Sequence, residues 1–275
     1  MKNGCCIVET RRMDNLVSII KDHHLKYLPK DWGLTIFCGP DNHDQVKRVR
    51  FKRDTTIIVL DNPPLTKISH YNALLKSTTF WNHLPYEKVL IFQTDSKLLR
   101  TGIEEFIEYD YIGAPRRTPG ANGGLSIRNV DVMKYICEKH GSGMRGNEDL
   151  AFAAVMRHRR IGRQARREEC TKFSVESIFA LGSLGVHNIE RWLSPEQRRA
   201  ILTQYEHAPK LSIKEKIMAG KGMRPKMGYN IKKWNVNFGK INWGVNKSPK
   251  KCKCTTCKCK KALEDEEKPN PSPNK

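Results

Sequence analysis

The chain has 275 residues, of which 38% are hydrophobic, and it carries a formal net charge of +21 at pH 7. No apolar run approaches the ~20 residues that a membrane-spanning helix needs. The N-terminal sequence MKNGCCIVETRR lacks the apolar core of a secretory signal. These features exclude a membrane span and predict a cytoplasmic protein. The cysteines number nine. Those before residue 200 are scattered, which indicates reduced thiols rather than a disulfide framework.

The positive charge is concentrated near the C-terminus. Between residues 208 and 262 there are 16 Lys or Arg residues and one acid, Glu215, which together account for +15 of the +21. Apolar periodicity fades there. We therefore predict a folded domain over 1–205 and a basic, cysteine-containing, disordered tail over 206–275 that binds polyanions in a salt-dependent way. The tail cysteines could hold a soft metal ion or be incidental; they are Cys252, Cys254, Cys257 and Cys259.

Up to residue 205, short apolar strands alternate with amphipathic helices. This order predicts an α/β fold with a mainly parallel sheet flanked by helices on both faces. The expected strands are 5–8, 34–38, 56–60, 89–92, 109–115, an extended part of 120–128, 173–179 and 185–187. The expected helices are 15–27, 45–49, 71–81, 129–140, 150–156 and 195–205, the last capped by a serine followed by proline.

The most distinctive stretch is the strand VLIF at 89–92 followed by QTDS at 93–96. Ligands of open α/β sheets bind outside the carboxyl ends of the strands. Asp95 is therefore placed to meet a metal or a phosphate-bearing ligand. It could equally cap the following turn.

Three further polar segments are expected at the same edge of the sheet. They are Asn122-Gly123-Gly124, Glu148-Asp149 and His187. Asp and His together suit Mn²⁺ better than Ca²⁺. Two alternatives stay open, since Glu148-Asp149 could cap a helix and His187 could be a packed core histidine. Arg128 is interpreted as either a phosphate ligand or, more often, a surface charge.

In this order, the motifs QTDS, EYDYIGAP, NGGLSIR, NED and GVHNIERW resemble a glycosyltransferase-like family catalogued as a domain of unknown function. That family has a GT-A-type fold, which binds nucleotide sugars. The resemblance extends from about residue 5 to 205. Each motif alone is weak, but their order and spacing are more specific.

The resemblance implies roles for these residues. The donor-binding residues would be Glu9, Thr10, Arg11, Thr94, Asp95, Ser96, Asn122, Gly123 and Gly124. The metal ligands would be Asp95 and His187, and the catalytic base Asp149 or Glu148. Thr94-Asp95-Ser96 takes the place of an Asp-x-Asp motif, yet it has one carboxylate where most metal-dependent relatives have two.

We therefore expect a glycosyltransferase that moves a sugar from a nucleotide-sugar donor, UDP-linked in our interpretation, to an acceptor hydroxyl of a glycan or protein. Mn²⁺ or Mg²⁺ would assist departure of the diphosphate. The transition state would be oxocarbenium-like, and we favour inversion with Asp149 as base. Two other functions fit the sequence: a basic nucleic-acid-binding protein with an inactive α/β domain, and a nucleotidyltransferase.

Overall fold

The structure is a computed structural model that describes residues 2–60, 65, 67–117 and 120–206. Within these residues, one sheet of six strands has the order β3-β2-β1-β4-β7-β6. The strands are β1 Asn3–Val8, β2 Gly33–Cys38, β3 Thr55–Val59, β4 Lys88–Phe92, β6 Tyr111–Pro115 and β7 Ala121–Asn129.

β1 and β4 form the centre of this sheet. β1 is parallel to both β2 and β4, and β2 is parallel to β3. Cys5 lies beside Leu34 of β2 on one side and Leu90 of β4 on the other. β7 runs antiparallel to both β4 and β6. Every residue of β2 and β4 is buried, as expected for strands that are covered on both faces.

A second, three-stranded sheet has the order β5-β9-β8. Its strands are β5 Ser96–Leu98, β8 Ser174–Val175 and β9 Gly185–His187. Ser96 pairs directly with His187 in an antiparallel ladder. Because β5 begins four residues after β4 ends, this small sheet holds residues 93–96 against β9 at the carboxyl end of β4.

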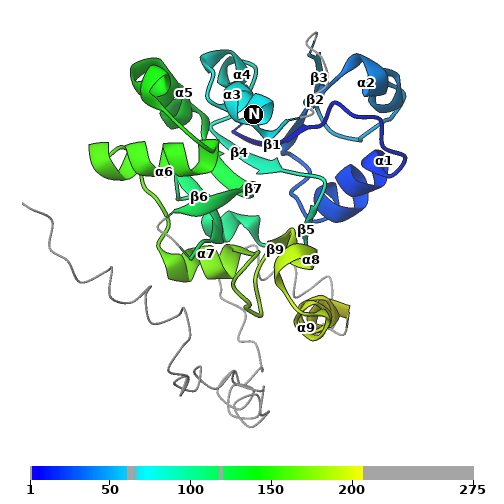
Figure 1. Ribbon diagram of the computed structural model, residues 1–275. Coiled ribbons are helices and arrows are strands. Elements are labelled where there is room, and N and C mark those ends of the chain that lie inside the picture. The colour runs from blue at the N-terminus through cyan, green and yellow to red at the C-terminus, as the bar shows by residue number, and fades with distance from the viewer. Residues whose placement is uncertain (1, 61–64, 66, 118–119, 207–275) are drawn as a thin grey trace, which may run out of the picture. The chain divides into compact units, whose positions relative to one another are not determined.

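Helices cover both faces of the central sheet (Figure 1). Figure 1 shows α3, α4 and α5 on one side, and α7 with the small sheet on the other. The bounds are α1 Leu16–Ser18, η1 Ile19–Leu25, α2 Pro40–Lys47, α3 Ile68–Leu75, α4 Thr78–Asn82, η2 Ile103–Phe106, α5 Val130–His140, η3 Gly141–Gly143, α6 Glu148–Arg159, α7 Arg167–Phe173, α8 Ile189–Trp192 and α9 Pro195–Glu206.

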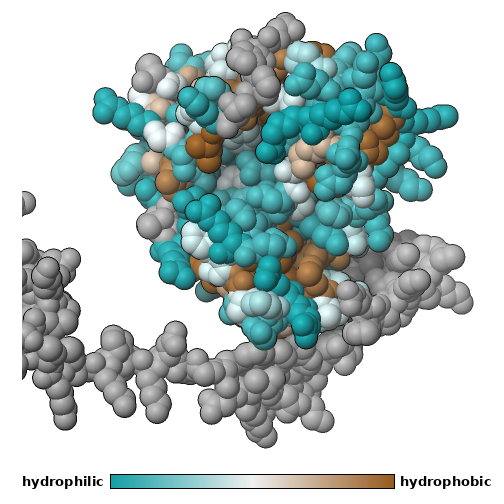
Figure 2. All heavy atoms as spheres, turned by 45° about the vertical axis from the view of Figure 1, so that its right-hand side comes forward, coloured by the Kyte–Doolittle hydropathy of each residue, from teal (hydrophilic) through white to brown (hydrophobic). Residues whose placement is uncertain are grey.

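The main hydrophobic core lies between the sheet and these helices. Its largest aromatic members include Phe37, Phe80, Trp81 and Phe152, whose rings pack in sequence across the sheet face. A smaller core of Leu99, Val175, Val186, Ile189, Leu193 and Ile201 supports β9 and α9. The face drawn in Figure 2 is mostly hydrophilic, with hydrophobic side chains gathered low on it.

The predicted fold class is confirmed: the described part of the chain is α/β, with a mostly parallel central sheet flanked by helices. The five described cysteines are free and buried, as expected. Among the described residues, no helix is both long and apolar enough to cross a membrane. The predicted tail lies, apart from Glu206, outside the described residues.

The helix predicted over 71–81 is two helices, α3 and α4. The break lies at Ser77, whose hydroxyl donates to Leu74 O at 2.7 Å and accepts from Phe80 N at 3.3 Å. The same side chain thus ends one helix and caps the next. Periodicity could not separate the two, because buried residues continue through both helices, including Leu75 and Phe80.

The Gly/Pro segments follow the predictions in part. β2 ends at Cys38 as predicted, but α2 begins at Pro40 rather than at residue 45, and the missing N–H of a proline costs nothing at the first position of a helix. Residues 113–115 lie in β6, within the strand predicted over 109–115. Asn122-Gly123-Gly124, which the glycosyltransferase resemblance places in a loop, is part of β7 itself. Bulky neighbours occupy the space beside both glycines, as described below.

Arg128 of β7 is fully buried, which overturns its assignment as a surface charge or phosphate ligand. Its Nη1 and Nη2 donate to Glu148 Oε2 and Oε1 at 2.6 and 3.1 Å. Its Nε donates to Ser126 Oγ at 3.0 Å, and the guanidinium lies over the Tyr111 ring. This ion pair joins β7 to the first residue of α6, so the helix start is fixed to the sheet.

We predict that Glu148→Gln destabilises the protein by about 3–5 kcal/mol, because it leaves the buried Arg128 charge without its counter-ion. The double variant Arg128→Met/Glu148→Met should recover much of this loss, since it removes both charges together. Urea unfolding followed by circular dichroism gives the free energies of unfolding. Equal losses in single and double variants would contradict this account.

Candidate active site

Four separate segments meet at the carboxyl end of β4. Gln93 N donates to Gly124 O at 2.9 Å, just where β4 and β7 part. Asn188 N donates to Asp95 O at 2.9 Å, which ties the turn after β4 to the residue after β9. Residues 93–96, 122–124 and 187 are therefore joined by backbone hydrogen bonds. Glu148 and Asp149 adjoin these segments because both lie against Gly123.

His187 is the centre of this cluster. Its Nε2 faces Asp95 Oδ1 at 3.3 Å and Gln93 Oε1 at 3.2 Å, while its Nδ1 faces Glu176 Oε1 at 3.3 Å. Burial opposes a charge on this ring. Hydrogen bonds to Asp95 and Glu176, together with their negative charges, outweigh burial and raise the pKa of His187 to about 9. His187 is therefore an imidazolium at neutral pH when nothing else is bound.

Asp95 is the exposed member of the cluster, with 45% of its side chain accessible. Burial alone would raise its pKa. Its hydrogen bond to His187, the His187 charge and the more distant charge of Arg11 lower the pKa below the ordinary value instead. Asp95 is thus an ionised carboxylate that faces solvent beside a buried cation.

Gly124 is glycine because the His187 ring lies where a side chain would be. A Cβ at this position would overlap Nε2, Cε1 and Cδ2 of the imidazole. Asn122 makes two hydrogen bonds that fix this segment. Its Oδ1 accepts from Gly124 N at 2.7 Å, and its Nδ2 donates to Glu176 Oε1 at 3.0 Å. Asn122 therefore fixes the carboxylate that in turn faces His187.

Gly123 is required for a different reason. A Cβ there would come within 2.5 Å of Glu148 Oε1 and 2.6 Å of Arg128 Nη2. Both carboxylate oxygens of Glu148 are bonded to Arg128, and its backbone N donates to Asn72 Oδ1 at 2.8 Å. The adjacent glycines thus admit two different neighbours, His187 on one side of the strand and the Arg128–Glu148 pair on the other.

Asp149 follows Glu148 in the first turn of α6 and is also buried. Its Oδ2 accepts from Arg116 Nη1 at 2.6 Å, and its Oδ1 accepts from Leu150 N at 2.7 Å. Arg116 lies just beyond the end of β6 and is partly exposed. Of the two predicted acids, Asp149 has the solvent-accessible partner, whereas Glu148 is enclosed with Arg128.

A cavity of about 270 Å³ opens beside Asp95, between the carboxyl ends of β1 and β4. Its walls are Val8, Glu9, Thr10, Arg11, Leu65, Lys67, Ile68, Tyr71, Gln93, Thr94 and Asp95. Arg11 donates from its backbone and from Nε to Glu9 Oε1, and from Nη2 to Glu9 Oε2. Thr10 Oγ1 accepts from Leu65 N at 2.8 Å. Glu9 and Thr10 are thus bonded within the wall, and Arg11 is an exposed cation of it.

Ser96, predicted at the donor site, points away from this cavity. Its hydroxyl donates to Gln93 O at 2.7 Å and lies 3.3 Å from His24 Nε2, and the residue is buried. Thr94 and Asp95 do line the cavity. Within QTDS, the side chains that face solvent or the cavity are therefore those of residues 93–95.

The surroundings of His187 fit a divalent cation. A metal-ligating histidine commonly donates its other ring N–H to a carboxylate, and Glu176 Oε1 lies 3.3 Å from Nδ1, near it but not hydrogen-bonded to it. The 3.3 Å between His187 Nε2 and Asp95 Oδ1 suits two neighbouring ligands, each about 2.1 Å from one ion. Among the described residues, no three His, Cys, Asp or Glu side chains gather as a complete metal site. An ion held here would take its other ligands from phosphates and water.

Residues 54–187 match the sequence profile of a family described as a protein of unknown function, DUF5672. The match includes residues 94–96, 122–124, 148–149 and 187, while Glu9, Thr10 and Arg11 lie outside it. It covers slightly less than half of the chain. The family description names no activity.

Among solved structures, the chain is similar to the glycosyltransferase GlyE of Streptococcus pneumoniae TIGR4. The TM-score is 0.39 and the sequence identity 10%, over 56% of this chain and 43% of that one. The chain thus spans less than half the length of that protein. A comparison with curated proteins finds no match.

Sequence reasoning missed Glu176, Gln93 and Arg116. Glu176 directly follows β8, so the rule that drew attention to Asp95, a carboxylate just past a strand, also applies to it. It was overlooked because 173–179 was taken as one strand, whereas β8 has only two residues. No pattern in the sequence predicts that Arg116 pairs with Asp149, 33 residues away.

We predict that the metal-free protein loses stability as the pH rises from about 6.5 to about 9. His187 has a raised pKa in the folded state, so its contribution is complete below its unfolded pKa and disappears as the pH passes the folded value. The change should be about 3 kcal/mol. Urea unfolding in EDTA across this range measures it. His187→Gln should flatten the profile, whereas the exposed His158→Gln should leave it unchanged; a steep profile in His187→Gln would contradict the assignment.

Proposed function

We propose that the protein is a glycosyltransferase that uses a nucleotide-sugar donor, UDP-linked, and transfers the sugar to a hydroxyl group. The observation that carries this proposal is the cavity at the carboxyl ends of β1 and β4, with Asp95 and the buried His187 at its edge. Ligands of open α/β sheets bind in this position.

The charges around the cavity suit a diphosphate. Arg11, which is paired with Glu9, and Lys67 are exposed cations on its wall, and Asp95 is an exposed carboxylate of the same lining. A divalent ion held by Asp95 and His187 would neutralise the departing diphosphate. For His187 to bind it, Nε2 must first lose its proton, so metal affinity should increase with pH. Gln93 and Glu176 would keep the ring in position.

Asp149 is the acid that we assign to the proton transfer. In the reaction, an acceptor oxygen forms a bond to the anomeric carbon while the bond from that carbon to the diphosphate breaks. The acceptor proton passes to Asp149, and the electron pair leaves with the nucleoside diphosphate. Arg116, bonded to Asp149 Oδ2, would orient the carboxylate. We assign Glu148 a structural role instead, because Arg128 binds both of its oxygens.

We expect Asp95→Asn to weaken Mn²⁺-dependent binding of UDP at least about tenfold, because it removes the exposed carboxylate from the proposed metal site. Isothermal titration calorimetry with UDP, with and without Mn²⁺, measures the effect. Asp44→Asn on α2 is the matched control, since that carboxylate is exposed and does not line the cavity. Unchanged metal-dependent binding in Asp95→Asn would refute the metal assignment.

The identity of the released product distinguishes glycosyl transfer from nucleotidyl transfer. A panel of nucleotide sugars and, in separate reactions, the nucleoside triphosphates are incubated with the protein and Mn²⁺. Transfer to an acceptor or to water releases a nucleoside diphosphate, whereas nucleotidyl transfer from a nucleoside triphosphate releases pyrophosphate. Pyrophosphate release alone would favour the nucleotidyltransferase alternative. Release of neither product across the panel would contradict the proposed activity.

Asp149→Asn should lower kcat by roughly 10²–10⁴-fold, the usual worth of a positioned base. The dissociation constant for UDP should stay within about twofold of the wild-type value, because Asp149 does not line the cavity beside Asp95. Steady-state kinetics and calorimetry on the same preparation test both statements. A kcat near the wild-type value would show that Asp149 serves only to bind Arg116 and begin α6.

A further inference from the structure

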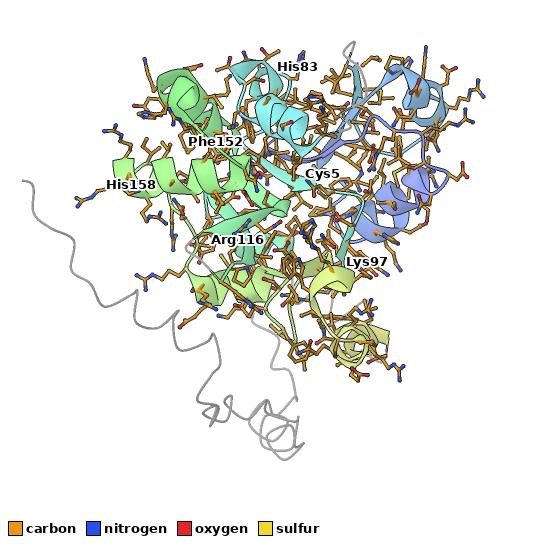
Figure 3. The ribbon with its side chains drawn as sticks, viewed as in Figure 1. Cys5, His83, Lys97, Arg116, Phe152 and His158 are labelled. Atoms are coloured by element: carbon orange, nitrogen blue, oxygen red, sulfur yellow. The ribbon has the colours of Figure 1, made fainter. Side chains whose placement is uncertain are left out.

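A second cavity, of about 260 Å³, lies at the edge of the central sheet beside β6. Its lining comes from the end of β6, the start of β7, the segment before α7, and α7 itself. The charged members are all arginines: Arg116, Arg117 and Arg167. Figure 3 shows Arg116 between the ribbons of α6 and α7. Among the described residues that line this cavity, none is a carboxylate.

The charge of these three arginines is only partly balanced. Arg116 is paired with Asp149 at 2.6 Å. Arg117 and Arg167 are exposed and take part in none of the ion pairs found in the described part of the chain. Two guanidinium charges thus remain at the cavity. Their proximity is unfavourable unless an anion lies between them.

The chemistry of the cavity wall favours an oxyanion. Arginine presents paired N–H donors that match phosphate oxygens, and two such groups balance the two negative charges of a phosphate monoester. Cys170 also contributes to the lining. Burial raises its pKa to about 11, so the thiol stays neutral and does not repel an anion.

The surroundings strengthen this preference. Residues 157–167 contain six arginines and no acid, and this segment leads from the end of α6 to the start of α7. Arg163 is paired with Glu108, and Glu168 and Glu169 follow the segment directly. The remaining positive charge raises the local concentration of anions. The second cavity therefore lies at one end of an arginine-rich segment.

Arg116 connects this cavity to the candidate active site. It lines the cavity and binds Asp149, the proposed base. We propose that the second cavity is the acceptor subsite and that it binds a phosphate monoester carried by the acceptor. This inference rests on the proposed function, since it assumes that Asp149 serves the acceptor hydroxyl. Arg117 and Arg167 hold the phosphate, and Arg116 lies between the phosphate and the carboxylate.

The test compares a phosphorylated sugar with its uncharged counterpart. Binding of a hexose 6-phosphate, the unphosphorylated hexose and inorganic phosphate is measured by calorimetry at fixed ionic strength. The double variant Arg117→Gln/Arg167→Gln is compared with Arg157→Gln/Arg159→Gln, which removes two exposed arginines of the same basic segment outside the cavity lining. We expect the cavity variant to weaken hexose 6-phosphate binding by at least roughly 100-fold, and the control variant by less than about threefold.

Three results would overturn the proposal: no binding of the hexose 6-phosphate by the wild type, equal weakening in both double variants, or equal affinity for the uncharged hexose. Equal weakening would instead indicate a general polyanion surface, such as one for RNA. UDP binding with Mn²⁺ is measured in parallel and should be unchanged in the cavity variant. Phosphate-ester binding without UDP binding would refute the proposed function while leaving the anion site in place.

Discussion

The buried ion pair between Arg128 and Glu148 is the interaction on which the candidate site depends. It joins β7 to the first residue of α6, and both side chains are buried from water. A charged pair in this position costs desolvation energy, which only good geometry offsets. Both oxygens of Glu148 and three nitrogens of Arg128 are bonded. The direction of α6, and with it the position of Asp149, follows from this pair.

His187 makes a second connection of the same kind at the other side of β7. It joins the turn after β4 to the small sheet through Asp95 and Glu176, and it lies directly against Gly124. The two glycines are therefore explained together: each admits a charged group against the strand. What resembles a flexible loop in the sequence is a rigid strand whose side-chain space is filled by neighbours.

Much of the fold could be predicted from the sequence, because buried strands such as 34–38 and 89–92 are continuous apolar runs. Because these strands alternate with helices along the chain, the sequence also predicts that they pair in parallel. The paired glycines could not be placed, since their conformation is set by His187 and Glu148, which are distant in the sequence. Arg128 was misjudged for a similar reason: an arginine is buried only when a partner neutralises it, and no local pattern shows that Glu148, 20 residues later, is that partner. Asp95 and His187 were found because Asp95 lies shortly after a strand and His187 ends one. Glu176 does so too, but its strand is too short to detect.

The late position of β9 in the chain means that the sheet alone does not complete the charged cluster. All six strands of the large sheet lie at or before Asn129, yet His187 lies 58 residues further on and Glu176 lies 47 further on. The strand that precedes Asp95 and the strand that presents His187 therefore belong to different sheets, and the two side chains meet across 92 residues of chain. A chain that ended at β7 would keep Asp95 but would lack both its cationic neighbour and the carboxylate at the other ring nitrogen.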